Sequence, residues 1–74
     1  MKKTIQVKKN LQSKKVAVYN STLDMVLVWL KPGDKLKYDT NDVKEYYLDR
    51  FGEIPYKKVF YNGQMGYIVA EAVE

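Results

Sequence analysis

The chain has 74 residues and a formal charge of +4, and it contains neither cysteine nor histidine. A chain of this length forms one small domain that buries roughly 60% of the surface exposed by its unfolded state. The missing thiol and imidazole groups exclude disulfides, thiolate nucleophiles and the commonest metal ligand, so we expect no metal, no cofactor and no enzyme.

The positive charge is concentrated at the N-terminus. The first 23 residues carry six lysines and no acid, whereas the rest of the chain has a net charge of −2. The lysines form three pairs, which are Lys2-Lys3, Lys8-Lys9 and Lys14-Lys15. Residues 1–15 are thus a basic extension. Its lysine pairs either bind nucleic-acid phosphates or protect an exposed strand edge. The second interpretation is favoured because the rest of the chain is acidic.

No segment resembles a membrane span or a secretory signal. The longest apolar run covers residues 25–30, far short of the ~20 residues that a spanning helix needs. The apolar residues near the N-terminus are interrupted by Gln6 and Lys8, so a signal-peptide core is absent. We therefore expect a cytoplasmic protein without membrane contact.

The first half of the chain alternates between apolar and polar residues in short runs, which is typical of strands. Strands are expected within residues 4–8, 14–19, 25–30 and 35–38. The sequence Lys31-Pro32-Gly33-Asp34 predicts a tight turn between the last two. The run at 25–30 is apolar on both faces, so we expect it to be packed from two sides.

The pattern becomes helical between residues 39 and 55. We expect a short inserted helix from Asp42 to Phe51, with Gly52 at its end. Its apolar and aromatic residues span an arc of about 200°, which is wider than the ~100° that covers a core.

This surplus arc predicts an exposed binding surface. In the helix, Val43, Tyr47 and Phe51 would face inward, leaving Tyr46 and Arg50 at one margin. Tyrosine and arginine are enriched among the residues that dominate interface energies. The alternative is a helix that only plugs one end of a barrel.

The last part of the chain predicts a β-hairpin. Residues 56–61 and 65–69 are β-rich, and Asn62-Gly63 between them is the dipeptide typical of a tight hairpin turn. Gly66 is expected where a neighbouring strand approaches closely. Residues 70–73 form either a short strand or a single 3₁₀ turn. Together the elements predict a mainly β fold, a small barrel of five to six strands with one inserted helix.

This hairpin resembles the C-terminal end of bacterial SH3-like domains. The matching residues are Lys58, Val59, Tyr61, Asn62, Gly63, Gly66 and Tyr67. Residues 16–19 and 28–36 are similar to the first strand and the strand–turn–strand of the same family. The resemblance implies an SH3-like barrel over residues 1–74 and a binding role, commonly to cell walls or peptides as part of secreted hydrolases. This chain shows neither the hydrolase nor an export signal, and its segment 39–55 is longer than in the family.

The aromatic residues divide between core and surface. We expect Trp29, Tyr61 and Tyr67 in the core together with Val59. Tyr56 and Phe60 lie on the opposite strand face and are expected to be accessible from outside. The candidate partner-binding residues are therefore Tyr46, Arg50, Tyr56 and Phe60.

The acidic residues around the predicted helix are candidates for a glycosidase-like carboxylate pair. They are Asp39, Asp42, Glu45, Asp49 and Glu53. Helix capping and solubility explain them better, and so short a chain has little room for a sugar-binding cleft.

The sequence thus favours a non-catalytic protein-binding module. Such a protein suits a small modulator or inhibitor of a larger partner, of bacterial or phage origin. Nucleic-acid binding through the lysine pairs and cell-wall binding are the alternatives, and the oligomeric state stays open.

Overall fold

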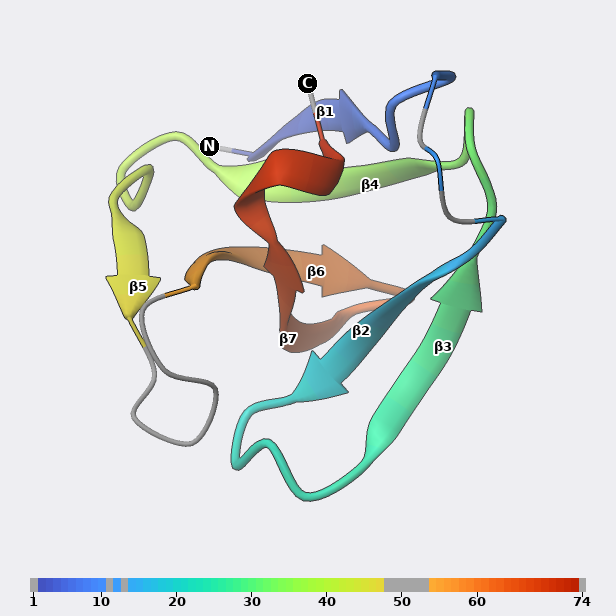
Figure 1. The fold of residues 1–74 in the computed structure, drawn as a ribbon. Helices are drawn as coiled ribbons and strands as arrows, with labels where there is room; N and C mark the ends of the chain where they lie inside the picture. Colours follow the sequence, from blue (N-terminus) through green and yellow to red (C-terminus); the bar gives the residue numbers. More distant parts are fainter. Residues whose placement is uncertain (1, 11, 13, 48–53, 74) are drawn as a thin grey trace.

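The protein is seen in a computed structural model that describes residues 2–10, 12, 14–47 and 54–73. These residues form an antiparallel sheet of seven strands and one 3₁₀ turn (Figure 1). The strands are β1 (Lys2–Gln6), β2 (Val16–Asn20), β3 (Val26–Leu30), β4 (Lys35–Asp39), β5 (Glu45–Tyr47), β6 (Pro55–Tyr61) and β7 (Gln64–Val69), and the turn is η2 (Ala70–Ala72). The predicted mainly β fold is confirmed, although the described residues form seven strands where five to six were expected.

The sheet has the strand order β1-β4-β6-β7-β2-β3, and β5 pairs with β6 beside this path. The sheet is strongly bent, so that β1 and β4 cross above β6 and β7 while β2 and β3 run diagonally below them (Figure 1). Within the described residues the pairing does not join β1 to β3, so these two strands are the ends of this strand order, and β5 also pairs on one side only.

Short aliphatic side chains from β2, β3, β4, β6 and β7, together with two residues outside the strands, form the core. The buried cluster consists of Val7, Val18, Leu30, Leu36, Val59, Ile68 and Val73. Val59 is fully buried, and Tyr61 packs against the cluster, as predicted. The prediction for Trp29 is wrong, because this side chain is 53% exposed. Trp29 pairs with Ala17 and lies on the face away from its neighbours Val28 and Leu30, which contact the core.

The N-terminal segment belongs to this core. Val7 is fully buried, and its backbone amide donates to the carbonyl of Asp34 at 2.8 Å while its carbonyl accepts from the amide of Gly33 at 2.9 Å. Val7 also bridges to Val73 near the other end of the chain. Residues 2–7 therefore complete the fold and are more than a basic extension.

Both predicted turns are confirmed. In the turn after β3, the amide of Asp34 donates to the carbonyl of Lys31 at 3.0 Å, and Gly33 has a φ of 93°. In the β6–β7 hairpin, Asn62 and Gly63 have φ angles of 50° and 80°. Two consecutive positive φ angles match the right-handed twist of the strands that the hairpin connects.

Gly66 lies where β2 and β7 approach each other, as predicted. A Cβ atom at this position would overlap the backbone carbonyl of Tyr19 and press on the side chain of Val18. Only glycine therefore permits this strand spacing.

The predicted helix is wrong. Residues 42–44 have no regular structure and Glu45–Tyr47 form β5, while residues 48–51 lie outside the described part of the chain. Tyr46 pairs with Tyr56 in β6. Strand pairing with the free side of β6 has overridden the helical pattern, because tyrosine fits a half-buried pleated surface well.

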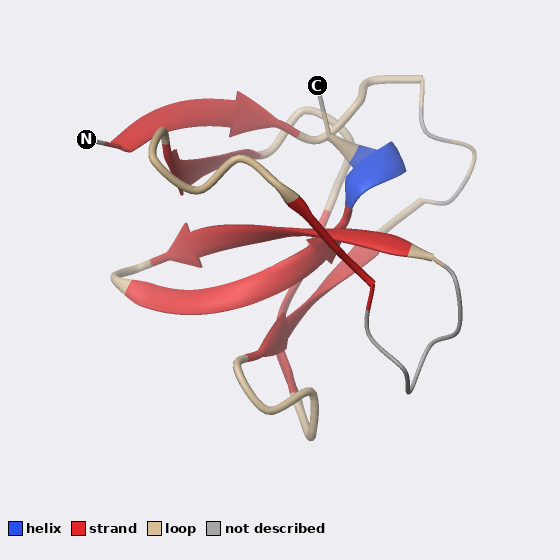
Figure 2. Ribbon diagram, turned by 90° about the vertical axis from the view of Figure 1, so that its left-hand side faces the viewer, coloured by secondary structure: helices blue, strands red, loops and turns tan. Residues whose placement is uncertain are grey.

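Figure 2 shows the thin β5 crossing over β6 and the single turn η2 above the sheet. In the part of the chain that the structure describes, no helix has the length and apolarity needed to cross a membrane.

Candidate partner-binding site

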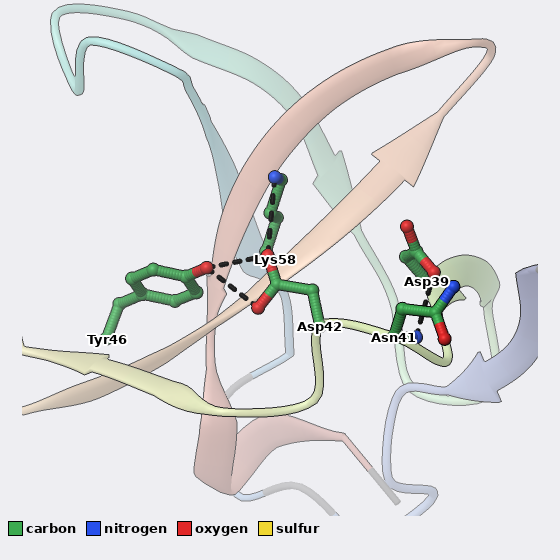
Figure 3. Close-up of polar contacts among 5 residues, drawn as sticks. All are labelled: Asp39, Asn41, Asp42, Tyr46 and Lys58. Atoms are coloured by element: carbon green, nitrogen blue, oxygen red, sulfur yellow. Dashed lines mark hydrogen bonds and ion pairs between the residues drawn. The ribbon is translucent and has the colours of Figure 1, made fainter.

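A polar cluster fastens β5 to the sheet (Figure 3). The Tyr46 hydroxyl donates to the carboxylate of Asp42, with its oxygen 2.6 Å from Oδ2 and 2.8 Å from Oδ1. The Lys58 ammonium of β6 lies 3.3 Å from Oδ2 of the same carboxylate. Asp42 and Tyr46 are four residues apart, a spacing that is typical of contacts within a helix. Here it allows a contact between a loop residue and a strand residue.

This cluster shifts the pKa values of its members in opposite directions. The hydrogen bond from Tyr46, supported by the nearby Lys58, lowers the pKa of Asp42 from its ordinary value, although partial burial opposes the change. The same hydrogen bond, together with desolvation, raises the pKa of Tyr46 to about 12. The arrangement holds a proton on Tyr46 and a charge on Asp42, which suits a structural contact.

The tyrosines around this cluster pack edge to face. The rings of Tyr46 and Tyr67 are 5.4 Å apart at 69°, and those of Tyr19 and Tyr56 are 6.3 Å apart at 68°. Burial raises the pKa of Tyr56, with a further contribution from Tyr19. These T-shaped pairs stabilise the outer face of the sheet where β2, β5, β6 and β7 meet.

The four predicted binding residues are therefore placed differently from expectation. Tyr46 is half-buried and hydrogen-bonded to Asp42, and Arg50 lies outside the described residues. The predicted accessibility of Tyr56 is wrong, because its side chain is only 3% exposed. Phe60 is half-buried, and the Lys2 ammonium lies 4.2 Å from its ring centroid.

The large apolar side chains expected to face inward from the helix are exposed instead. Val43 is 57% exposed and Tyr47 is 61% exposed, because Val43 precedes β5 in a loop and Tyr47 lies on β5 beside its half-buried neighbour Tyr46. Phe51 falls outside the described residues.

An uncharged and accessible edge belongs to β3. Met25, just before this strand, is 67% exposed and Trp29 within it is 53% exposed. The expectation that residues 25–30 are packed from two sides is wrong, because these two side chains are exposed along a strand that ends the sheet order. The Lys15 ammonium lies 4.5 Å from the centroid of the Trp29 ring. Sequence reasoning missed this site because an uncharged apolar run is equally compatible with a central strand.

The other end of the sheet is protected. β1 begins with Lys2 and Lys3, both exposed, and lysine on an end strand opposes pairing with another chain. The two ends of one sheet thus differ in kind, with charge on β1 and an apolar surface on β3.

The predicted lysine pairs do not form one surface. Lys2 lies over Phe60, whereas Lys15 lies over Trp29 on β3. Lys8 and Lys15 border a hollow of about 470 Å³ near η2. Among the described residues that follow β1, Lys8, Lys9, Lys14 and Lys15 lie outside the strands, so the alternation assumed for the pairs is lost.

Two of the acidic residues around the predicted helix, Asp39 and Asp42, are engaged in local contacts. Asp42 binds Tyr46 and Lys58, and Asp39 accepts the backbone amide of Asn41 at 2.9 Å (Figure 3). Asp49 and Glu53 lie outside the described residues, and among those described no group of three or more acids is arranged to hold a metal ion.

Comparisons with protein-family models, with curated proteins and with solved structures found no match to this chain.

Proposed function

We propose that the protein is a non-catalytic protein-binding module that captures an extended segment of a partner along the outer edge of β3. One observation carries this proposal: the end strand Val26–Leu30 is uncharged, and the side chains of Met25 and Trp29 are exposed along it. A strand at the end of a sheet presents backbone donors and acceptors on its outer side, ready to pair with another chain.

Strand addition of this kind divides affinity and specificity between two parts of the contact. Backbone hydrogen bonds along the edge supply affinity, while alternate side chains select the sequence that fits. Tryptophan and methionine are enriched at protein interfaces, and tryptophan is frequent among the residues whose loss weakens binding most. Trp29 and Met25 supply such anchors on this edge.

The charge around the edge defines the partner's chemistry. Lys15 lies beside Trp29, Lys14 is exposed next to it, and Lys31 is exposed just after β3. We therefore propose an extended apolar segment with acidic flanking residues as the occupant. A second copy of this chain is disfavoured because two molecules of charge +4 repel each other.

We further propose that the fold is an SH3-like barrel and that the protein acts in the cytoplasm. Support for the barrel comes from the strands β2, β3, β4, β6 and β7, which form at the family-like segments of the sequence. The positive φ angles at Asn62-Gly63 and the tight approach at Gly66 agree with the roles of those residues in the motif.

Cross-linking from the edge of β3 tests the binding proposal. A photo-reactive residue at position 25 should give a discrete adduct in cells, mapped by peptide mass spectrometry to an extended apolar segment of one partner. The Trp29→Lys substitution should remove this adduct, because a lysine in the strand opposes pairing. Both positions are more than half exposed, so the thermal midpoint should stay near the wild-type value.

Position 43 is the matched control. Val43 is also apolar and 57% exposed, but it lies in the loop before β5 and away from β3. A photo-reactive residue there should give no partner adduct, and Val43→Lys should leave the adduct from position 25 intact. Equal adducts from both positions, or adducts only with a second copy of this chain, would contradict the proposal.

A further inference from the structure

A basic hollow lies at the opposite end of the sheet from β3. It has a volume of about 490 Å³ and lies between the β1–β4 pair and the turn of the β6–β7 hairpin. Figure 2 shows this hairpin turn on the same side of the molecule as the start of β1. The lining residues are Lys2, Thr4, Lys35, Leu36, Lys37, Phe60, Tyr61, Asn62 and Gly63.

The strand register sets basic and aromatic side chains next to each other here. Thr4 pairs with Lys37 across β1 and β4, and Lys37 pairs with Phe60 across β4 and β6. Because paired residues of antiparallel strands share a face, these three side chains form one row across the sheet. Lys35 lies two residues before Lys37 and therefore points to the same side.

We infer that this hollow binds single-stranded nucleic acid, with phosphates on Lys35 and Lys37 and an unpaired base on Phe60. Among the lining residues that the structure describes there are three lysines and no acid, which makes the hollow complementary to a polyanion. A basic groove beside an aromatic ring is the combination used to bind single strands, because phosphates and base faces are recognised together.

In the free protein, the Lys2 ammonium occupies the ring face that would stack on a base. It lies 4.2 Å from the centroid of the Phe60 ring and therefore covers one face of that ring. When a phosphate enters, the ammonium moves to the anion and the ring face becomes free for a base. The exposure of the Lys2 side chain makes this exchange easy, since its contact with the ring is weak at an exposed site.

This site combines parts of the two earlier expectations with new residues. Its Lys35 and Lys37 on β4 were not singled out by the sequence, whereas Phe60 was a predicted partner-binding residue and Lys2 belongs to one of the predicted lysine pairs. It also lies on β1, β4 and the end of β6, and β7 and β2 separate these strands from β3, so a protein partner on β3 and a nucleic acid in the hollow can be bound together.

Fluorescence anisotropy with a labelled thymidine oligonucleotide tests the inference on the full chain. Binding should be measurable at low salt and should weaken as salt rises. In the double variant Lys35→Gln/Lys37→Gln, the slope of log affinity against log salt should fall by about 1.4, since each single-strand phosphate contact contributes about 0.7. The matched control Lys9→Gln/Lys14→Gln removes the same charge from exposed lysines outside the hollow and should keep the wild-type slope.

The stacking step has its own readout. Phe60→Leu should weaken binding on the order of 10-fold without changing the salt slope, and an oligonucleotide with abasic sites should lose affinity for the wild type to a similar extent. Thermal midpoints of all variants check folding.

Several results would overturn the inference. They are no binding at low salt, equal losses in the two lysine double variants, tighter binding of duplex than of single strand, or binding of inorganic polyphosphate as tight as that of the oligonucleotide.

Discussion

At the scale of single residues, the contact between Tyr46 and Asp42 makes a contribution to stability that depends on pH. The folded state favours the charged form of Asp42, so this contribution is present above the ordinary pKa of 3.8 and is lost as the pH falls. It also favours the protonated form of Tyr46, so that contribution is present below 10.0 and is lost as the pH rises through about 12. The contact is therefore strongest between these limits.

The alkaline limb isolates Tyr46. The wild-type free energy of unfolding should fall more steeply between pH 10.0 and about 12 than that of Tyr46→Phe, which has no phenol to ionise. Denaturant titrations at a series of pH values measure this difference. Tyr47→Phe is the matched control, because Tyr47 is 61% exposed and its loss should leave the wild-type profile unchanged. Parallel profiles for the wild type and Tyr46→Phe would show that the contact is absent in solution.

Local backbone conformation was predictable where it requires a particular residue type, such as glycine or asparagine. Asn62 and Gly63 have the positive φ angles that their sequence predicts, and Gly66 lies at a close strand approach. Exposure was harder to predict, because it depends on what lies opposite a strand face. Trp29 and Tyr56 were therefore assigned to the wrong sides of the core boundary.

At the scale of elements, strands of five to seven residues were located well because alternation is a local signal. The prediction of a helix from Asp42 was wrong because the same aromatic spacing is compatible with a helix and with a strand. In β5, Tyr46 is held by pairing with Tyr56 and by the carboxylate of Asp42, and both contacts come from tertiary structure. No local pattern distinguishes that outcome from a helix in so short a segment.

The order of strands in the sheet also decided which surfaces are accessible. The sequence predicted β3 correctly but could not show that it ends the sheet, and this position is what exposes Met25 and Trp29. The lysines of β1 were predicted to protect an edge, and Lys2 and Lys3 do lie on the other end strand.

At the scale of the whole molecule, the N-terminal segment is what joins the parts of the fold. Val7 contacts the turn before β4 and the residue after η2, and the Lys8 amide donates to the carbonyl of Ala72 at 2.8 Å. Charge alone gave no indication of this role, since a basic segment is compatible with a solvated arm.

Truncating Val7 tests this structural role. Val7→Ala should destabilise the protein by about 2 kcal/mol, because the removed methyl groups leave a cavity at a fully buried position. For a domain of this size, that loss lowers the thermal midpoint by roughly 8–16 °C in a melting experiment. Lys9→Ala, two residues further along on the surface, should change the midpoint little. Equal midpoints for Val7→Ala and the wild type would show that the segment is a peripheral arm.

Hydrogen exchange along the edge of β3 tests the proposed binding mode most directly. The measurement uses NMR on the free protein and on its complex with a synthetic peptide of the segment cross-linked from position 25. At a peptide concentration 100 times the Kd, alternate amides within Val26–Leu30, those pointing away from β2, should exchange about 100-fold more slowly. The amides of β1 should be unchanged. Peptide binding that leaves the β3 amides unprotected, or protects β1 instead, would contradict strand addition at this edge.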